Sequence, residues 1–320
     1  MNESFRNDVL YYLENKLLIN SIAIRYNENK NNIYSKQFTK AGPGKYIGNI
    51  LDSPDLVWTD DLWDENRIQD AHSRLEKQGN KSIVSSFWRC KYENEASTYW
   101  HEFYKRNTTN FYKDRHYLHI VFPDLLNAEK SLLEVGCGVG NAVIPLLEIN
   151  PKLKIYAFDC AKSAIELFGQ NVLYENNKNR MNLYVCDIVK DNSSPVDHNS
   201  MDYILCMFVL SAISPLEHIQ VFNKLKNSLK IGGRIFLRDY GLYDEAQLRF
   251  KKNSKLDDNF YVRDDGTCSY FFCENDIKMI CNQCDLKVIE FKYINRQYAN
   301  RGQKVARYRV WIHAILEKQS

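Results

Sequence analysis

The sequence lacks several features that would narrow its class at once. No apolar run reaches the roughly 18 residues that a membrane-spanning helix requires. The N-terminal stretch mixes Glu3, Asp8 and Glu14 with its apolar residues, and because secretory and organellar leaders are usually poor in acids, we expect no such leader. The formal net charge of +3 is only mildly basic, so it permits an anionic partner without demanding one. We therefore expect no membrane partner.

Signatures of hydrolytic and metal chemistry are also missing. No Ser/His/Asp or H-E-x-x-H arrangement is visible. Four cysteines near the C-terminus, Cys268, Cys273, Cys281 and Cys284, include a C-x-x-C, but a zinc site would require two such pairs in knuckles. Cys281 and Cys284 fall in a helical pattern, so we expect buried free thiols and no metal. All nine cysteines lie in apolar or strand-like surroundings, which suits reduced thiols in the cytoplasm or nucleus.

Composition divides the chain into three regions. A chain of 320 residues that is 44% hydrophobic can bury a full core. Residues 1–60 are rich in Asn and Lys and end in a Gly/Pro loop, so we expect an N-terminal extension that is partly disordered. Residues 61–125 begin with helical patterns and end in a dense run of aromatics. Residues 126–320 alternate short β-rich runs with helical patterns and form the main domain.

This alternation predicts an α/β fold with a mostly parallel sheet and helices on both faces. The predicted strands are 132–135, 154–158, 183–186, 203–207, 234–237, 286–293 and 306–316. The last two follow each other with no helix between them, so they should pair antiparallel at the end of the sheet. We therefore expect a Rossmann-like, seven-stranded sheet that closes with an antiparallel C-terminal strand.

A glycine loop follows the first predicted strand in "SLLEVGCGVGNAV". Its spacing is G-x-G-x-G, one residue tighter than the G-x-G-x-x-G of dinucleotide-binding proteins. The Lys-Ser/Thr pair of a triphosphate-binding loop is absent. The loop is therefore suited to a nucleoside-like ligand without a pyrophosphate.

Three acids sit at the carboxyl ends of the predicted strands, where such folds bind ligands: Glu134, Asp159 and Asp187. Asp159 lies roughly 20 residues beyond the glycine loop, where an acid that binds a ribose diol belongs. Asp187 is placed for an adenine amino group, and Ile188 and Met207 can sandwich the ring. An acidic rim suits a sulfonium and an ammonium, so the predicted cofactor is S-adenosylmethionine. The alternative is that both Asp residues merely cap the helices that follow them.

The remaining motifs carry a family resemblance. They are "YWHEFYKRNTTNFYKDRHYL", "FVLSAISP", "RIFLRDYGLYDEAQLRF", "NFYVRDDGTCSYFF" and "NRGQKVARYRVWI". In this order they resemble the methyltransferase-like enzymes that form 3-methylcytidine at position 32 of the tRNA anticodon loop, over roughly residues 85–315. The resemblance implies a class I S-adenosylmethionine-dependent methyltransferase domain, preceded by a segment that contacts the cofactor and RNA.

The resemblance also assigns the cofactor contacts. They are Trp100, Tyr104, Gly136, Asp159, Asp187, Ile188 and Met207. Met207 departs from the family, where a relative carries isoleucine, and Met is a comparable flexible apolar filler. Cys273 stands where a relative has threonine, so no chemistry is assigned to that thiol.

The chemistry of the target base suggests the catalytic residues. Cytosine N3 carries its lone pair on the Watson–Crick edge, so the target must be a loop base or a flipped base. Positive charge moves onto the base during transfer, and a nearby acid would stabilise it. We expect Asp239 to fill this role first and Arg238 to contact the cytosine O2 or a phosphate. Tyr240 or Tyr243 would stack on the base.

Two basic stretches are expected to bind RNA. In "KDRHYL", Lys113, Arg115 and His116 form a lid over the cofactor, with Asp114 as their internal partner. Charge alone favours an ordinary ion pair at a helix start, whereas the neighbouring aromatics and the resemblance favour the lid. Near the C-terminus the expected RNA contacts are Arg301, Lys304 and Arg307.

Other functions stay open at this stage. One is a methyltransferase of a small molecule or protein side chain, and another is a non-catalytic tRNA-binding subunit. The segment "YKRNTTNF" resembles relatives associated with serine tRNA and its synthetase, whereas "NRGQKVARYRVWI" resembles relatives linked to threonine or arginine tRNA. The isoacceptors, the need for a partner protein and the oligomeric state are not decided by the sequence.

Overall fold

The structure of this chain is a computed structural model that describes residues 50–52, 58–60, 65–78, 83–109, 111–127 and 129–319. Most of the N-terminal extension expected over residues 1–60 therefore lies outside the described residues. Within the described part of the chain, no helix is both long and apolar enough to cross a bilayer.

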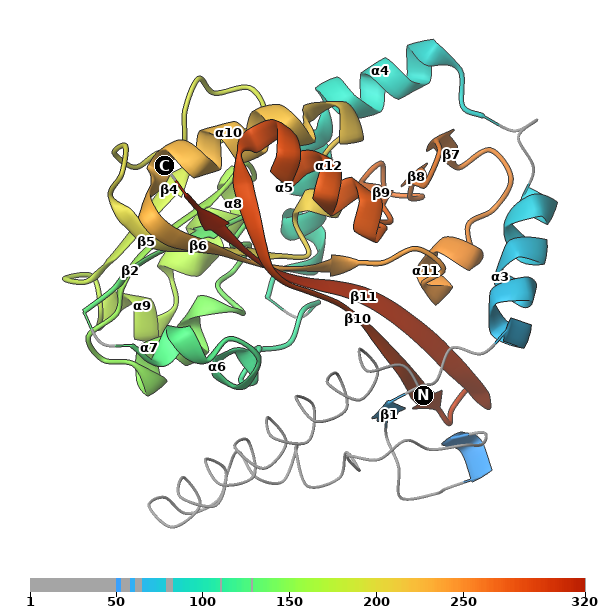
Figure 1. The fold of residues 1–320 in the computed structure, drawn as a ribbon, viewed down its shortest axis with the longest axis horizontal. Coiled ribbons are helices and arrows are strands. Elements are labelled where there is room, and N and C mark those ends of the chain that lie inside the picture. Colours follow the sequence, from blue (N-terminus) through green and yellow to red (C-terminus); the bar gives the residue numbers. More distant parts are fainter. Residues whose placement is uncertain are drawn as a thin grey trace.

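The centre of the molecule is an eight-stranded sheet in the order β1-β10-β11-β6-β5-β2-β3-β4 (Figure 1). Its strands are β1 Trp58–Asp60, β2 Ser131–Val135, β3 Lys154–Asp159, β4 Met181–Val185, β5 Met201–Met207, β6 Leu229–Tyr240, β10 Leu286–Asn300 and β11 Val305–Lys318. Strands β2 to β6 pair in parallel, and β11 runs antiparallel to both β6 and β10. The predicted α/β fold and its antiparallel closure are confirmed, and β1 adds an edge strand that the sequence pattern did not predict.

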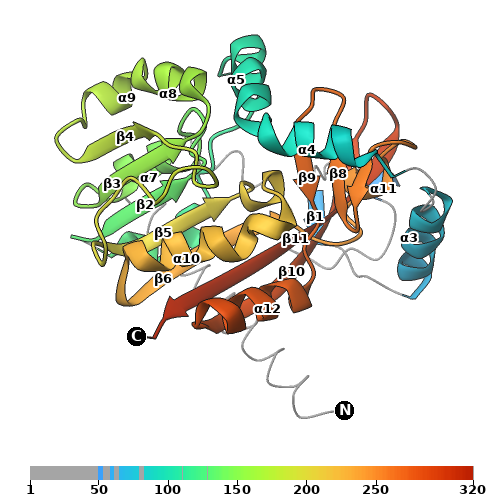
Figure 2. The same cartoon turned by 90° about the horizontal axis from the view of Figure 1, so that it is seen from above.

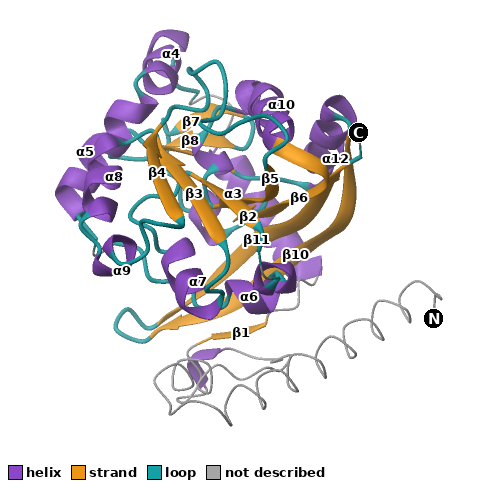
Figure 3. Ribbon diagram, turned by 90° about the vertical axis from the view of Figure 1, so that its left-hand side faces the viewer, coloured by secondary structure: helices purple, strands orange, loops and turns teal. Residues whose placement is uncertain are grey.

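Helices cover both faces of this sheet (Figure 3). They are α3 Glu65–Gln78, α4 Ser86–Asn94, α5 Ala96–Asn107, α6 Leu118–Val121, α7 Val143–Ile149, α8 Lys162–Gly169, α9 Val172–Glu175, α10 His218–Ser228, α11 Glu245–Leu248 and α12 Glu274–Cys284. Helices α10 and α12 pack on one face, and α6 and α7 pack on the other. This layering places the loops that follow the parallel strands along one edge of the sheet.

Alternation along the strands explains why the sheet is buried on both sides. In β5, Ile204 and Cys206 join the core with α10 and α12, whereas Tyr203, Leu205 and Met207 join the core with α6 and α7. Successive side chains of a strand point to opposite faces, so a strand covered on both sides needs an almost continuous apolar run. The short apolar runs of the sequence are therefore central strands of a doubly covered sheet.

A second, small sheet lies beside α4 and was not predicted as a unit (Figure 2). Its antiparallel strands are β7 Lys255–Asp257, β8 Phe260–Val262 and β9 Cys268–Tyr270. It is joined to α4 by the ion pair between Arg89 and Asp257, in which Nη1 and Oδ2 lie 2.7 Å apart. Strands of three residues carry too little alternation to be recognised from the sequence.

Some predicted helices and strands differ from the observed ones in where they begin and end. The helical pattern that follows the second predicted strand, over residues 161–176, suggests a single helix, but the chain forms α8 and α9. The break occurs at Gly169–Asn171, where the Asn171 Oδ1 accepts a hydrogen bond of 2.8 Å from the Leu173 amide and caps α9. The final hairpin is longer than expected because β10 and β11 stay paired beyond the apolar segments, as far as Asn300 and Val305.

Candidate active site

The glycine loop joins β2 to α7 and requires its glycines. Gly136 and Gly138 have φ values of +61° and +53°, in the left-handed region that glycine tolerates best. A Cβ on Gly136 would lie 2.2 Å from Cγ2 of Val209, and one on Gly138 would lie 2.4 Å from the Tyr104 hydroxyl. The loop is thus pressed between α5 and the segment after β5, and its backbone faces the cavity beside them.

A cavity of about 270 Å³ lies along the carboxyl ends of β2, β3 and β5. The structure brings together there all seven residues expected to contact the cofactor: Trp100, Tyr104, Gly136, Asp159, Asp187, Ile188 and Met207. They come from α5, from the glycine loop and from the ends of three strands. Parallel strands deliver their following residues to one edge of a sheet, which explains why residues so distant in sequence meet here.

Glu134 is the most unusual side chain of this cavity. It is buried, and its Oε2 has no hydrogen-bond partner among the described residues. Burial raises the pKa of its carboxyl group to about 8, against the opposing effect of the nearby Arg115 guanidinium. A buried acceptor without a partner costs free energy unless a ligand supplies a donor. The site therefore fits a ligand that carries a positive charge or N–H groups.

Asp159 and Asp187 both accept hydrogen bonds from the backbone, which is the structural one of the two roles that the sequence left open. The Asp159 carboxylate accepts hydrogen bonds from the amides of Gly138 at 2.9 Å and Ala161 at 2.8 Å. Oδ1 of Asp187 accepts from the amides of Val189 and Lys190 at 3.2 and 3.3 Å. Both acids therefore order the loops that follow their strands. Each carboxylate oxygen has two lone pairs, so both can also accept from ligand hydroxyl or amino groups.

A second cavity of about 320 Å³ adjoins the first and shares Trp100 and Tyr112 with it. Its wall also contains Phe103, Arg106, Asn107, Phe111, Tyr240, Arg263, Asp265 and Thr267. The wall is aromatic on several sides and carries two arginines and one carboxylate. Arg263 and Asp265 were not expected to belong to a site, although both lie in the motif "NFYVRDDGTCSYFF".

The structure does not place Arg238 and Asp239 where their expected catalytic roles require. Asp239 is fully buried, and its carboxylate accepts from the amides of Ser211 at 3.0 Å and Tyr240 at 2.8 Å. Arg238 is 2% exposed and lies over the Tyr117 ring, near His313. Neither residue lines either cavity. Alternation along β6 turns their side chains into the two protein cores beside the sheet.

Tyr240, the last residue of β6, and Tyr243 lie in different surroundings. Tyr240 lines the second cavity, with its ring centre 5.3 Å from that of Phe208. Tyr243 lies instead against α3, where its hydroxyl is 3.1 Å from Nε2 of His72. Of the two stacking candidates, only Tyr240 is positioned beside a cavity, because the chain turns away from the sheet at Gly241.

The residues that were expected to form a lid over the cofactor also lie in different surroundings. Arg115 lines the first cavity, and its guanidinium carbon lies 4.8 Å from the ring centre of Phe208. Lys113 is exposed and His116 is half-buried, and neither lines one of these two cavities. Asp114 accepts a hydrogen bond of 2.9 Å from the Asn141 side chain, so it ties this segment to the end of the glycine loop. It is not the internal partner of the basic residues that was expected.

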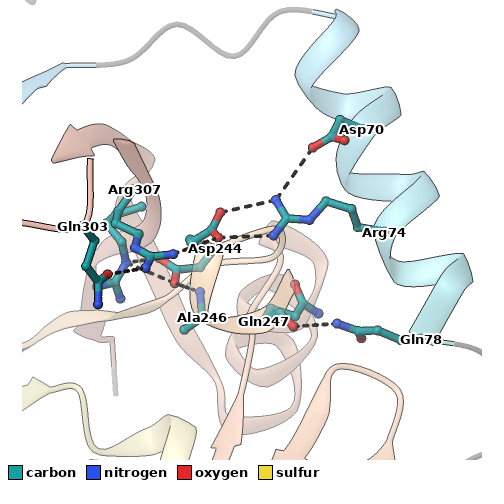
Figure 4. A network of polar contacts seen from close by, with 10 residues as sticks. Asp70, Arg74, Gln78, Asp244, Ala246, Gln247, Gln303 and Arg307 are labelled. Atoms are coloured by element: carbon teal, nitrogen blue, oxygen red, sulfur yellow. Dashed lines mark hydrogen bonds and ion pairs between the residues drawn. The ribbon is translucent and has the colours of Figure 1, made fainter. Parts of the chain in front are cut away.

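The C-terminal basic residues lie on the long hairpin. Arg301 and Lys304 are exposed at its turn, and Figure 1 shows this turn at the far end of the ribbon that β10 and β11 form. Arg307 is engaged with protein groups, because its Nη2 donates to Gln303 at 2.8 Å and its Nη1 lies 3.7 Å from Glu245. Figure 4 shows Arg307 and Arg74 of α3 approaching the acids at the start of α11 from opposite sides.

Comparison with known proteins shows the family to which this chain belongs. Residues 133–235 match a family described as a methyltransferase domain. The human tRNA N(3)-cytidine methyltransferase METTL6 is 38% identical over 257 residues, which cover 78% of this chain and 89% of that protein. The chain belongs to the tRNA N(3)-cytidine methyltransferase family. A Xenopus tropicalis member, METTL2, is 35% identical over 82% of this chain and 90% of its own length.

Not every relative of this family carries the same name. O-methyltransferase 3 of Dictyostelium discoideum is 34% identical and covers 82% of this chain and 78% of its own length. The solved structures agree on the fold. A Burkholderia thailandensis 1,6-didemethyltoxoflavin-N1-methyltransferase and an Anabaena variabilis S-adenosylmethionine-dependent methyltransferase each have a TM-score of 0.50. They are 11% and 15% identical and cover 71% and 70% of this chain and 91% and 95% of their own lengths.

The cofactor of this family member is S-adenosylmethionine, as the glycine loop and the acids predicted. The first cavity fits it in three respects. The glycine loop contributes Gly136 and Gly138 to its wall, Asp159 and Asp187 add two carboxylates, and Glu134 adds a buried carboxylate oxygen without a partner among the described residues. The predicted cofactor is confirmed by the match to the methyltransferase family, and the residues of this cavity are consistent with it.

Proposed function

We propose that this enzyme methylates N3 of cytidine 32 in the anticodon loop of tRNA. The observation that carries the proposal is the pair of adjoining cavities with Trp100 and Tyr112 as their shared wall. The first cavity is acidic and suits a sulfonium nucleoside. The second is aromatic and contains arginines, which suits a base removed from its stack and attached to a phosphate backbone.

Methyl transfer to N3 depends on how the cytosine is positioned more than on general acid–base catalysis. Bound S-adenosylmethionine supplies an electrophilic methyl group, so the N3 lone pair of cytosine forms the new bond while the electrons of the C–S bond pass to sulfur. N3 of cytosine carries no proton at neutral pH, and the protein therefore needs no general base. Its contribution is to hold the base plane in line and to exclude water from the shared wall.

The residues of the first cavity receive distinct roles in this proposal. Asp159 binds the ribose hydroxyls, Asp187 binds the adenine amino group, and Ile188 and Met207 pack against the ring. Trp100 and Tyr104 close the cavity from α5. Glu134 accepts hydrogen bonds from the ammonium of the methionine part, which supplies the partner that its Oε2 lacks.

Asp239 acts as a positioning residue in this proposal. Its carboxylate holds the amide of Ser211 and thereby fixes the segment after β5 to the end of β6. That segment contributes Phe208, Val209 and Ala212 to the cofactor cavity. Arg238, buried over Tyr117, supports the opposite face of the same strand. These placements replace the direct contacts with the base that the sequence suggested.

The substrate surface extends from the cavities over the exposed basic residues. Arg115 lines the cofactor cavity, Lys113 is exposed two residues before it, and Arg301 and Lys304 lie at the hairpin turn. We assign Lys113, Arg115 and His116 to the RNA next to the target base and the hairpin to a more distant part of the tRNA. Serine, threonine or arginine isoacceptors are the proposed substrates, with an aminoacyl-tRNA synthetase such as seryl-tRNA synthetase as a candidate partner in the cytoplasm or nucleus.

The test is a nucleoside analysis of defined tRNAs. Unmodified transcripts of the three isoacceptor groups are incubated one by one with the protein and cofactor, with and without the matching synthetase. Mass spectrometry of the digested nucleosides should show 3-methylcytidine, and mapping should place it at position 32. An O-methylated nucleoside, or methylation of small hydroxyl compounds without tRNA methylation, would contradict the proposal.

A further inference from the structure

The turn between β8 and β9 forms one wall of the second cavity. It is closed by a hydrogen bond of 2.8 Å from the Arg263 amide to the Thr267 carbonyl and by one of 3.0 Å from the Gly266 amide to the Arg263 carbonyl. Gly266 has a φ of +84°, and a Cβ there would lie 2.3 Å from the Tyr99 ring of α5. The turn is therefore held in one place against the helix that also lines the cofactor cavity.

Asp265 is fixed in this turn through only one of its oxygens. Oδ1 accepts from the Thr267 amide at 3.0 Å and from the Thr267 hydroxyl at 2.7 Å. For Oδ2, the described residues offer no partner within hydrogen-bonding distance. Asp265 is the one carboxylate among the residues that line this cavity. The cavity wall thus contains one acceptor oxygen that none of the described residues uses.

Arg263 keeps this carboxylate in its place. Its guanidinium donates to the Thr267 hydroxyl at 3.3 Å, to the Cys268 carbonyl at 2.9 Å and to the Ser269 hydroxyl at 3.0 Å. Thr267 is 2% exposed, and its hydroxyl is held between Arg263 and Asp265. Arg263 acts on Asp265 through Thr267, which makes it a positioning residue.

The two pyrimidines differ at the atom beside N3. Cytosine presents an amino group there, which donates hydrogen bonds, whereas uracil presents a carbonyl oxygen, which accepts them. A carboxylate oxygen matches the first and repels the second. The aromatic residues of the cavity have no such preference, because every base has a face on which an aromatic ring can stack. Specificity for cytosine must therefore come from a polar group such as Asp265.

We propose that the second cavity holds the target cytosine and that Asp265 accepts a hydrogen bond from its exocyclic amino group. The proposal rests on the proposed function and identifies the residue that selects the base. As the N3 lone pair forms the bond to carbon and the C–S electrons pass to sulfur, the base gains one positive charge, which spreads onto the amino nitrogen. The carboxylate is then bound more strongly in the transition state than before it, so Asp265 accelerates transfer as well as selecting the base.

The decisive variant is Asp265→Asn. The asparagine oxygen can still accept from the Thr267 amide and keep the turn, while its amide nitrogen replaces Oδ2 and presents a donor to the amino group. Asp264→Asn is the matched control, because it removes the same charge from the neighbouring position. The Asp264 side chain is 86% exposed and pairs with Lys251 at 3.1 Å, away from the cavity wall. Single-turnover methylation should be at least about 30-fold slower for Asp265→Asn and unchanged for Asp264→Asn.

A second substrate separates selection of the base from support of the turn. The target cytidine is replaced by 2-pyrimidinone ribonucleoside, which keeps N3 and O2 but lacks the amino group. The ratio of the rates on cytidine and on this analogue should fall at least about tenfold from wild type to Asp265→Asn. A purely structural role would lower both rates and leave the ratio unchanged, which would overturn the proposal even if the variant is less stable.

Equilibrium binding gives a readout that does not depend on turnover. Anticodon stem–loops with cytidine or uridine at the target position are titrated into the protein saturated with S-adenosylhomocysteine. Wild type and Asp264→Asn should prefer cytidine, and Asp265→Asn should lose that preference. Equal preference in all three proteins would overturn the role of Asp265. If wild type methylates no tRNA cytidine at all, the proposed function itself fails, and this result is distinct because it is seen before any variant is compared.

Discussion

At the scale of single residues, two buried carboxyl groups near the cofactor cavity have opposite environments. Asp239 accepts hydrogen bonds from the amides of Ser211 and Tyr240, whereas Glu134 keeps one oxygen without a partner among the residues described. Burial raises the pKa of both, to about 6 for Asp239 and about 8 for Glu134. A satisfied carboxylate belongs to the protein scaffold, and an unsatisfied one is available for a ligand.

Glu134 predicts a pH-dependent affinity for the cofactor. The carboxyl group is neutral below its pKa of about 8, and only its ionised form pairs with the ammonium of S-adenosylmethionine. The affinity should therefore rise as the pH increases from 6 towards 8, with release of a proton on binding. Glu134→Gln should bind about tenfold more weakly at pH 7.5 and show a flatter profile. Titration calorimetry in two buffers of different ionisation enthalpy measures both effects, and an unchanged profile in the variant would refute the assignment.

Asp239→Asn should reduce stability and activity together. The asparagine amide keeps one acceptor oxygen but turns a donor towards one of the two amides that now donate to the carboxylate, which costs about 2 kcal/mol of unfolding free energy. Thermal melting should show a Tm lower by several degrees, and cofactor affinity should fall with it because the segment after β5 is loosened. Loss of the chemical step at an unchanged Tm and cofactor affinity would instead restore the catalytic role that the sequence suggested.

At the scale of elements, the hairpin β10–β11 does two things. Its inner half completes the sheet against β6, and its outer half continues as a ribbon that pairs with β1 (Figure 1). Arg307 on this ribbon and Arg74 on α3 both approach Glu245, so the ribbon, α3 and α11 are linked through one acid (Figure 4). The exposed basic turn at residues 301–304 is thus carried on a supported arm.

This arm predicts a salt-dependent contribution to tRNA binding. The double variant Arg301→Ala, Lys304→Ala should weaken tRNA binding and lower the slope of log affinity against log salt by about 0.7 for each phosphate that the turn no longer neutralises. Cofactor affinity should stay unchanged, because the turn lies outside both cavities. Lys152→Ala is the control. Lys152 is an exposed lysine that pairs with Glu129, and it lies just before β3, at the end of the strand opposite to the cofactor cavity. Equal slopes for the control and the double variant would exclude the turn from the interface.

At the scale of the whole molecule, the sequence predicted those features that depend on the order of residues along the chain. Apolar strand segments alternate with helical patterns, so the parallel sheet could be recognised, and Gly136, Asp159 and Asp187 could be placed at its edge from spacing alone. The orientation of the Asp239 side chain could not be predicted. It depends on the face of β6 to which this side chain points and on the hydrogen bond that it accepts from the amide of Ser211. The role of Asp265 depends on a turn in a sheet of three-residue strands, which leaves little pattern in the sequence.

The central claim is that an unpaired cytosine enters the second cavity with its N3 facing the cofactor cavity. It is tested most directly by single-turnover methylation of two stem–loops that share one sequence context. In one the target cytidine is unpaired in the loop, and in the other it is paired with guanosine in a stem. We expect 3-methylcytidine in the first, formed at least about 100-fold faster than in the second, because pairing occupies the N3 lone pair. Equal rates on both substrates, or a methyl group found on a ribose hydroxyl, would contradict it.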